Sequence, residues 1–175
     1  MTDSELEEYR LLRATIRQRG SVRLCLFVGG LAAWAAGAMA STLINVPLIT
    51  VIPLLVLAGS FEAVFALHIG VERVGRYLQV FHGDTWEQSA MAFGQPSGAA
   101  RTDPLFLLFF AFATMCNFVP VLIAGAVPIE LTVLGAVHAL FLLRLVVARQ
   151  ASARQRAVDL ERFRQLKSAE TRKTP

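Results

Sequence analysis

Apolar residues fill three long stretches of this 175-residue chain, and the charged residues gather before, between and after them. The stretch at residues 24–61 holds 38 residues without a charge, that at 105–129 holds 25, and that at 131–143 holds 13. One α-helix crosses a bilayer with about 20 apolar residues. The first stretch is therefore long enough for two spans, and the pattern predicts four in all. We place them at residues 22–40, 46–69, 104–124 and 128–147.

Two of the three connections between the predicted spans are short. Asn45 and Pro47 are typical turn residues between the first two spans, and residues 125–128 turn the chain between the last two. The four transmembrane helices are therefore expected to form two tight hairpins. The third connection, residues 83–103, is interrupted by glycine and proline. We expect a cytoplasmic loop there, with a short amphipathic helix on the membrane surface as the alternative.

The N-terminal residues 1–21 are expected to form an amphipathic cytoplasmic helix. Ser4 and Glu7 have the spacing of a capping box, in which each side chain binds the other residue's backbone N–H. Gly20 is expected to end this helix, because glycine readily adopts the conformation of a helix C-cap. Within the second span, Pro53 is expected to produce a kink, since proline removes one backbone hydrogen bond.

Helical periodicity also continues beyond the second and fourth spans. The second helix is expected to extend to about residue 82 as a cytoplasmic helix, because apolar residues recur there at steps of four and three. These residues are Leu67, Val71, Val74, Leu78 and Phe81. Residues 148–175 are expected to form a basic cytoplasmic helix and tail. The sequence thus predicts an all-α integral membrane protein with a single four-span domain over residues 1–175.

The basic residues lie at only one side of the predicted spans. Sixteen of the 17 Lys and Arg residues precede the first span or lie at its start, lie between the second and third spans, or belong to the C-terminal tail, and the two short turns contain none. Since Lys and Arg are concentrated in cytoplasmic segments, both termini are expected in the cytoplasm. The basic flanks are expected to contact anionic lipid. They lack the interleaved aromatic residues of a nucleic-acid groove, so no nucleic acid is expected as a partner.

The composition indicates where the protein resides. Charged residues make up 17% of the chain, against about 25% in soluble domains. The three uncharged stretches account for the difference, and because they hold four spans they exclude a water-soluble enzyme. Arginine outnumbers lysine 15 to 2 and alanine is abundant, as is typical of proteins from GC-rich bacterial genomes. We therefore expect a multi-pass protein of the inner (plasma) membrane of a bacterium.

Ionisable residues at membrane depth are the main candidates for a functional site, because they are costly there. Glu62 lies about 10 Å inside the cytoplasmic end of the second span, and Arg144 about 5 Å inside that of the fourth. We expect them to form a membrane ion pair. Its role is either structural, joining the two spans, or part of a proton or ion relay that His138 would extend.

Small residues recur every four positions in the first span, at Gly29, Ala33 and Gly37. Such a helix-packing ridge lets two helix backbones approach closely. It is expected to pack either against another span of the same chain or against a second copy.

Candidates for a metal site are weak. His68 and Glu72 share one helix face at a spacing of four residues, and His82 or Glu62 could be added to them. No pair of ligands has the spacing of a known metal motif, and such a site needs three or four converging ligands. Motifs for phosphate, dinucleotide or nucleophilic chemistry are absent as well. We expect no metal, no cofactor and no catalytic residues.

Three classes of function fit these observations. The first is a non-catalytic membrane protein that assembles with itself or serves as an accessory subunit of a membrane complex, and it is the preferred interpretation. The second is a small oligomeric channel or transporter using Glu62 and His138. The third is a membrane-embedded enzyme with a site near Glu62, His68 and Glu72. We lean against an enzyme, because no catalytic set accompanies these residues.

The charge distribution generates a prediction about topology. Single cysteines at Ser41 and at Gly125, in a background without Cys25 and Cys116, should react with a membrane-impermeant thiol reagent added outside whole cells. A cysteine at Ser97 should not react, because the middle connection is cytoplasmic in this topology. Labelling at Ser97 without labelling at Ser41 would show the opposite orientation.

Overall fold

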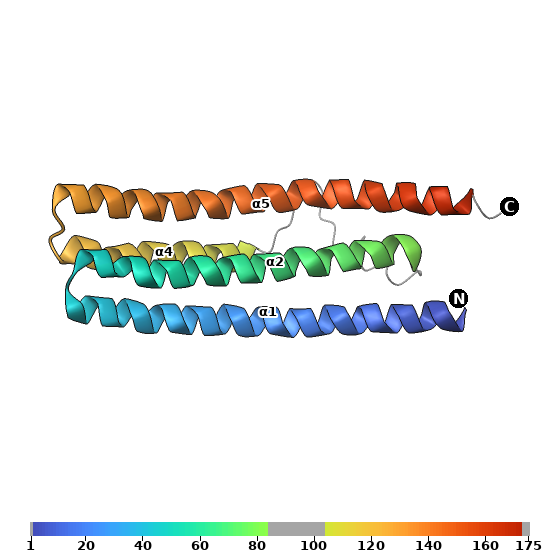
Figure 1. Cartoon of the computed structure of the whole chain (residues 1–175), viewed down its shortest axis with the longest axis horizontal. Helices are drawn as coiled ribbons and strands as arrows, with labels where there is room; N and C mark the ends of the chain where they lie inside the picture. The colour runs from blue at the N-terminus through green and yellow to red at the C-terminus, as the bar shows by residue number, and fades with distance from the viewer. Residues whose placement is uncertain (1, 84–103, 173–175) are drawn as a thin grey trace. The chain divides into compact units, whose positions relative to one another are not determined.

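The computed structural model describes residues 2–83 and 104–172, and it is helical throughout apart from short turns. The elements are α1 (Asp3–Ile44), the 3-10 helix η1 (Pro47–Thr50), α2 (Val51–Phe81), α4 (Pro104–Ile123) and α5 (Pro128–Thr171) (Figure 1). Each α-helix is long and apolar enough to cross a membrane. The fold class is confirmed at this level: the described residues are all-helical, and their four long apolar helices are those of a multi-pass membrane protein. The predicted loop falls outside the described residues from residue 84 onward, and so does Ser97.

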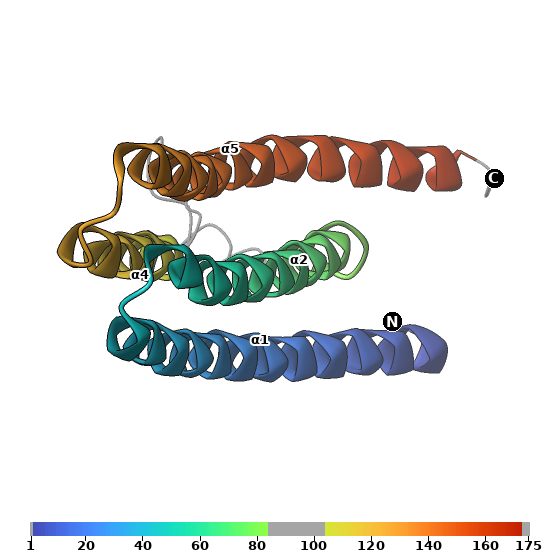
Figure 2. The same ribbon diagram turned by 60° about the vertical axis from the view of Figure 1, so that its left-hand side comes forward.

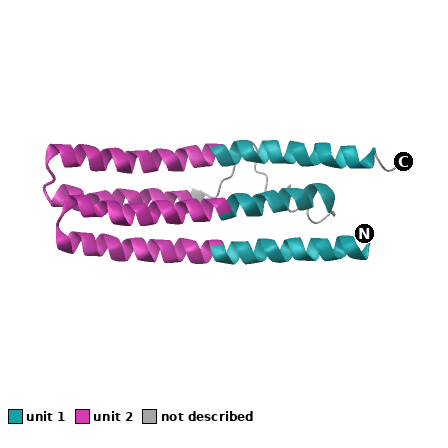
Figure 3. Cartoon of the chain, viewed as in Figure 1, with its two compact units in different colours: residues 1–22, 67–102, 151–175 teal, residues 23–66, 103–150 magenta. Residues whose placement is uncertain are grey.

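The helices contribute to two compact units (Figure 3). The apolar unit consists of residues 23–66 and 103–150. The polar unit consists of residues 1–22, 67–102 and 151–175. Every hydrogen bond and ion pair described below lies within one unit.

The start of α1 differs from the prediction. The capping box is formed by Thr2 and Glu5, two residues earlier than Ser4 and Glu7. The backbone N–H of Thr2 donates to Glu5 Oε2 at 2.6 Å, and the N–H of Glu5 donates to Thr2 Oγ1 at 3.3 Å. The sequence holds two overlapping patterns of the same spacing, and the earlier one caps the helix.

The predicted helix end at Gly20 is wrong, because α1 continues through this residue to Ile44. A glycine inside a helix costs only about 1 kcal/mol relative to alanine. It ends a helix when it adopts a left-handed conformation, and Gly20 does not. The helices that were expected to continue beyond their spans are also unbroken, α2 from Val51 to Phe81 and α5 from Pro128 to Thr171. The predicted boundaries between span and cytoplasmic helix therefore fall inside single helices.

The predicted kink at Pro53 is also wrong. The turn after α1 winds into η1, and α2 begins only at Val51. Pro53 is therefore in the first turn of α2, where backbone N–H groups have no partner within the helix. Pro120 differs, because it lies inside α4.

Two residues with positive φ mark the short connections that Figure 2 shows from α1 towards α2 and from α4 to α5. Asn45 has φ 55° and Gly125 has φ 68°. Asparagine and glycine adopt this left-handed conformation more readily than other residues.

The structure changes the choice of positions for the topology experiment, because Ser41 is buried. The topology experiment is therefore better done with cysteines at Leu43, which is 87% exposed, and at Val127, which is 53% exposed.

The core of the apolar unit is made by α2, α4 and α5, with α1 packed against it. Phe110 of α4 is completely buried and contacts Phe27 of α1 and Phe61 of α2, with ring centroids 5.7 and 5.3 Å apart. Phe61 also contacts Phe141 of α5 edge to face. The buried cluster comprises Leu54, Leu57, Phe61, Phe110, Ala113, Phe141, Leu145 and Ala148. In lipid this close packing, rather than escape from water, holds helices together.

Candidate functional site

The side-chain amide of Asn117 is the most connected polar group of the apolar unit. Asn117 lies on α4 and is 1% exposed. Its Nδ2 donates to the backbone carbonyl of Thr50 at 2.9 Å, and its Oδ1 accepts a hydrogen bond from Trp34 Nε1 at 3.1 Å. The second Nδ2 hydrogen reaches His138 Nε2 at 3.0 Å. The Asn117 network, which consists of Trp34, Thr50, Asn117 and His138, thus joins α1, η1, α4 and α5.

The contacts of His138 assign its tautomer. Because Asn117 Nδ2 can only donate, Nε2 of the imidazole accepts and carries no proton. Nδ1 then carries the proton and donates to the carbonyl of Leu134 at 2.7 Å. The ring of Phe118 packs against the imidazole with centroids 5.0 Å apart. A neutral His138 therefore has a partner for each ring nitrogen.

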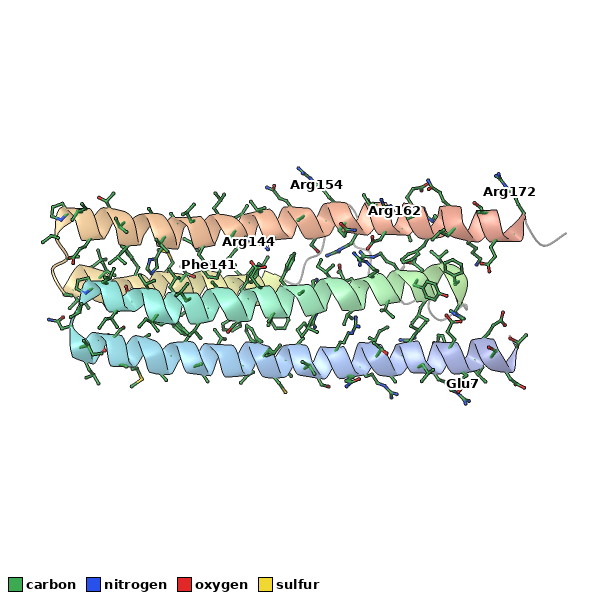
Figure 4. All side chains as sticks on the ribbon, viewed as in Figure 1. Glu7, Phe141, Arg144, Arg154, Arg162 and Arg172 are labelled. Atoms are coloured by element: carbon green, nitrogen blue, oxygen red, sulfur yellow. The ribbon has the colours of Figure 1, made fainter. Side chains whose placement is uncertain are left out.

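The structure brings Glu62 of α2 and Arg144 of α5 together, as a face-to-face pair with two parallel contacts. Arg144 Nε lies 2.8 Å from Glu62 Oε1, and Nη2 donates to Oε2 at 2.8 Å. The guanidinium also lies 5.9 and 5.6 Å from the ring centres of Phe61 and Phe65. Figure 4 shows Arg144 and Phe141 on α5. This bidentate geometry is the strongest form of ion pair between side chains.

The Glu62–Arg144 pair is nevertheless incompletely covered. The side chain of Glu62 is 48% exposed and that of Arg144 is 39% exposed. Charged residues inside membrane spans normally face the interior of a bundle. No hydrogen bond or ion pair among the described residues joins this pair to His138. The Glu62–Arg144 pair and His138, the two parts of the suggested relay, are therefore not connected by these contacts.

The predicted packing ridge is divided between two environments. Gly37 faces α2, since a Cβ built there would lie 3.3 Å from Pro53 Cβ. Gly29 and Ala33 are exposed, and nothing lies within 4 Å of a Cβ built at Gly29. The close approach to α2 is made instead at Gly30, where a Cβ would overlap the side chain of Ser60. The sequence does contain a pattern that could have identified Gly30: it lies seven residues, about two helical turns, before Gly37 and therefore on the same face of α1.

In the polar unit, α2 and α5 are joined by a cluster of ion pairs. Asp159 is 6% exposed and lies 3.3 Å from Arg73 Nε and 3.4 Å from Arg76 Nη2. Glu72 lies 3.2 Å from Arg156 Nη2 and 3.6 Å from Arg76 Nη1. Burial lowers the pKa of Arg76, while Glu72 and Asp159 act in the opposite direction. Arg76 follows Glu72 by four positions, which places both on one face of α2, whereas the partners from α5 lie more than 80 positions away and no local pattern connects them.

The weak metal candidates belong to this same region. His68 Nε2 lies 3.5 Å from Glu72 Oε1, whose carboxylate is also shared by two arginines. His82 lies 3.8 Å from Glu8 instead. Within residues 2–83 and 104–172, no three His, Cys, Asp or Glu side chains converge as metal ligands.

Near the ends of α2 and α1, Tyr77 donates a hydrogen bond to Glu8 at 2.8 Å. Burial raises the pKa of the Tyr77 hydroxyl, and this hydrogen bond adds to the effect. Glu8 Oε2 also lies 3.8 Å from His82 Nε2, so this carboxylate joins the start of α1 to both Tyr77 and His82 at the end of α2.

Comparison of the chain with protein-family models, with curated proteins and with solved structures gives no match.

The Asn117 network generates a prediction about stability. Asn117→Leu should lower the melting temperature of the purified protein in detergent by several degrees, because it leaves Trp34 Nε1, His138 Nε2 and the Thr50 carbonyl without their partner. Met115→Leu, on the same helix at an exposed position, should change it little. Equal effects of the two substitutions would show that the amide does not hold the bundle.

A double-mutant cycle tests the Glu62–Arg144 pair. Glu62→Gln leaves the Arg144 charge unpaired, and Arg144→Gln leaves the carboxylate unpaired, so each should lower the melting temperature. The double mutant should regain part of the loss, because residues in contact are not additive. Strictly additive losses would contradict a stabilising pair.

Proposed function

We propose that this protein is a non-catalytic membrane subunit that acts by assembling with copies of itself or with another membrane protein. The observation that carries the proposal is the exposed, small-residue face of α1. Gly29 and Ala33 lie on this face, and the α1 helix makes its close contact with α2 through Gly30 and Gly37 instead. Gly29 and Ala33 of the ridge therefore remain exposed after the helices of the chain have packed together.

The small-residue face extends along most of the apolar part of α1. Ala36 and Ala40 are exposed as well, one and two turns beyond Ala33 on the same side. Small side chains at steps of three and four let a second helix approach closely, which increases van der Waals contact in lipid. A face of this kind is suited to a partner helix rather than to lipid tails.

The Glu62–Arg144 pair supports the same proposal from a different pair of helices. A side chain that is 48% exposed leaves part of the carboxylate towards the bilayer. Covering an ion pair at membrane depth removes a cost that lipid tails cannot reduce. An assembled complex would provide such a cover, with polar groups of a neighbouring helix or with water held between subunits.

Several polar groups of the described bundle contact one another across helices. The Asn117 network links four helical segments, and Glu72 and Asp159 each lie within ion-pair distance of two arginines. Polar side chains joined across helices in this way stabilise the packing of those helices. This arrangement favours a structural role over an enzymatic one.

The finer organisation is part of the proposal. We place the protein in the inner (plasma) membrane of a bacterium, with both termini in the cytoplasm and two helical hairpins in the bilayer. The polar unit would then be cytoplasmic, formed by amphipathic extensions of the helices. The basic residues of this unit support that orientation, because they are concentrated on the cytoplasmic side of membrane proteins.

A small oligomeric channel or transporter is the second candidate, favoured by the exposure of the Glu62–Arg144 pair. In an oligomer that pair could line a path between subunits. Glu62→Gln would then abolish a proton- or cation-dependent flux in liposomes while leaving assembly intact, whereas a purely structural pair changes stability and no flux.

The assembly proposal is tested by the mass of the complex in mild detergent. The wild type should have the mass of several 19.1 kDa chains or of a stoichiometric complex with another membrane protein. Gly29→Leu with Ala33→Leu should reduce it to that of one chain without lowering the melting temperature, because both positions are exposed and nothing lies within 4 Å of a Cβ built at Gly29.

A matched control places the same enlargement on another exposed helix face, with Ala136→Leu and Ala139→Leu on α5. This pair should leave the assembly intact. A wild type that is purely monomeric, or equal dissociation by both pairs of substitutions, would contradict the proposal.

A further inference from the structure

An apolar groove of about 300 Å³ lies between α4 and α5 on the surface of the apolar unit. Its walls are leucine side chains, and Ala111 is the small residue between them. The lining residues are Leu107, Leu108 and Ala111 of α4, and Leu142, Leu145, Val146 and Arg149 of α5. Arg149 is the one charged group of this lining.

Two positive features lie at the same end of the groove. The first is the guanidinium of Arg149, which is exposed and makes no hydrogen bond or ion pair with any residue in the described part of the chain. The second is the N-terminus of α4 at Pro104. The backbone N–H groups of the first turn, up to Leu107, have no acceptor within the helix and form the positive end of its dipole.

The position of Arg149 along α5 matches the headgroup layer of the predicted topology. It follows Arg144 by five residues, about 7 Å along the helix, and lies just beyond residue 147, where the fourth span is predicted to end. The groove therefore leads from headgroup depth towards the hydrocarbon. An occupant must combine a long apolar chain with a negative group at one end.

We propose that this groove binds one anionic phospholipid, with an acyl chain between the leucines and the phosphate at Arg149 and the first turn of α4. Ala111, a lining residue with a small side chain, leaves room for an acyl chain. An anionic headgroup is preferred over a zwitterionic one, because the ammonium of the latter would be repelled by the guanidinium. The site uses α4 and α5 and is independent of the assembly face on α1.

The test compares two lipids on the full-length, delipidated protein in mild detergent. Phosphatidylglycerol and phosphatidylcholine with identical acyl chains are titrated, and bound lipid is counted by native mass spectrometry. The wild type should retain phosphatidylglycerol more tightly. Arg149→Gln should weaken that binding about fivefold and leave phosphatidylcholine nearly unchanged, as expected for one basic residue near a charged headgroup.

Two controls separate this groove from general surface charge and from a simple phosphate site. Arg154→Gln, at an exposed position of the same helix, should not alter phosphatidylglycerol binding. Ala111→Leu should fill the groove and reduce binding of both lipids. Inorganic phosphate alone should not raise the melting temperature as the lipid does, because it lacks the acyl chain.

Several results would overturn the proposal. These are equal binding of the two lipids by the wild type, an equal loss with Arg154→Gln and Arg149→Gln, or full stabilisation by inorganic phosphate. Unchanged lipid binding by a folded Ala111→Leu variant would also overturn it. If Ala111→Leu does not fold, the comparison of the two arginine variants still decides the question.

Discussion

The buried amide of Asn117 is the polar contact that orients α1, α4 and α5 around the segment that precedes α2. Apolar packing in lipid does not distinguish strongly between one rotation of a helix and another, since lipid tails are as apolar as leucine. The amide of Asn117 does distinguish them, because Trp34, Thr50 and His138 must all lie within about 3 Å of it at once. The aromatic core around Phe110 then fills the space that these bonds define.

The sequence was sufficient for the features that depend on local composition. Uncharged stretches predicted four membrane-length helices, and Asn45 and Gly125 marked the connections because few other residues adopt a positive φ. The rules that assign a helix end to glycine and a kink to proline were less reliable, because the surrounding chain decides whether either residue has that effect. Gly20 does not end α1. Pro53 does not interrupt α2, because the 3-10 helix η1 precedes it and α2 begins only two residues before this proline.

Contacts between residues that are distant in the sequence could be predicted only in part. Glu62 and Arg144 could be matched by depth, because each is the charged residue nearest that level on its own span. Asn117 and Trp34 are 83 positions apart, and no periodicity connects them. The ridge on α1 shows the same limit: the spacing of small residues predicts close packing, but the rotation of the helix decides that Gly30 faces α2 and Gly29 faces outward.

The Asn117 network also has a consequence for biogenesis. A chain inserted from its N-terminus brings Trp34 and Thr50 into the bilayer before Asn117, and His138 after it. A three-helix intermediate can therefore form two of the three hydrogen bonds of the amide. The third, to His138, forms only after the fourth helix has been inserted. His138 thus completes the polar interior, so a truncated or stalled chain would expose an unsatisfied amide hydrogen to lipid and differ chemically from the finished protein.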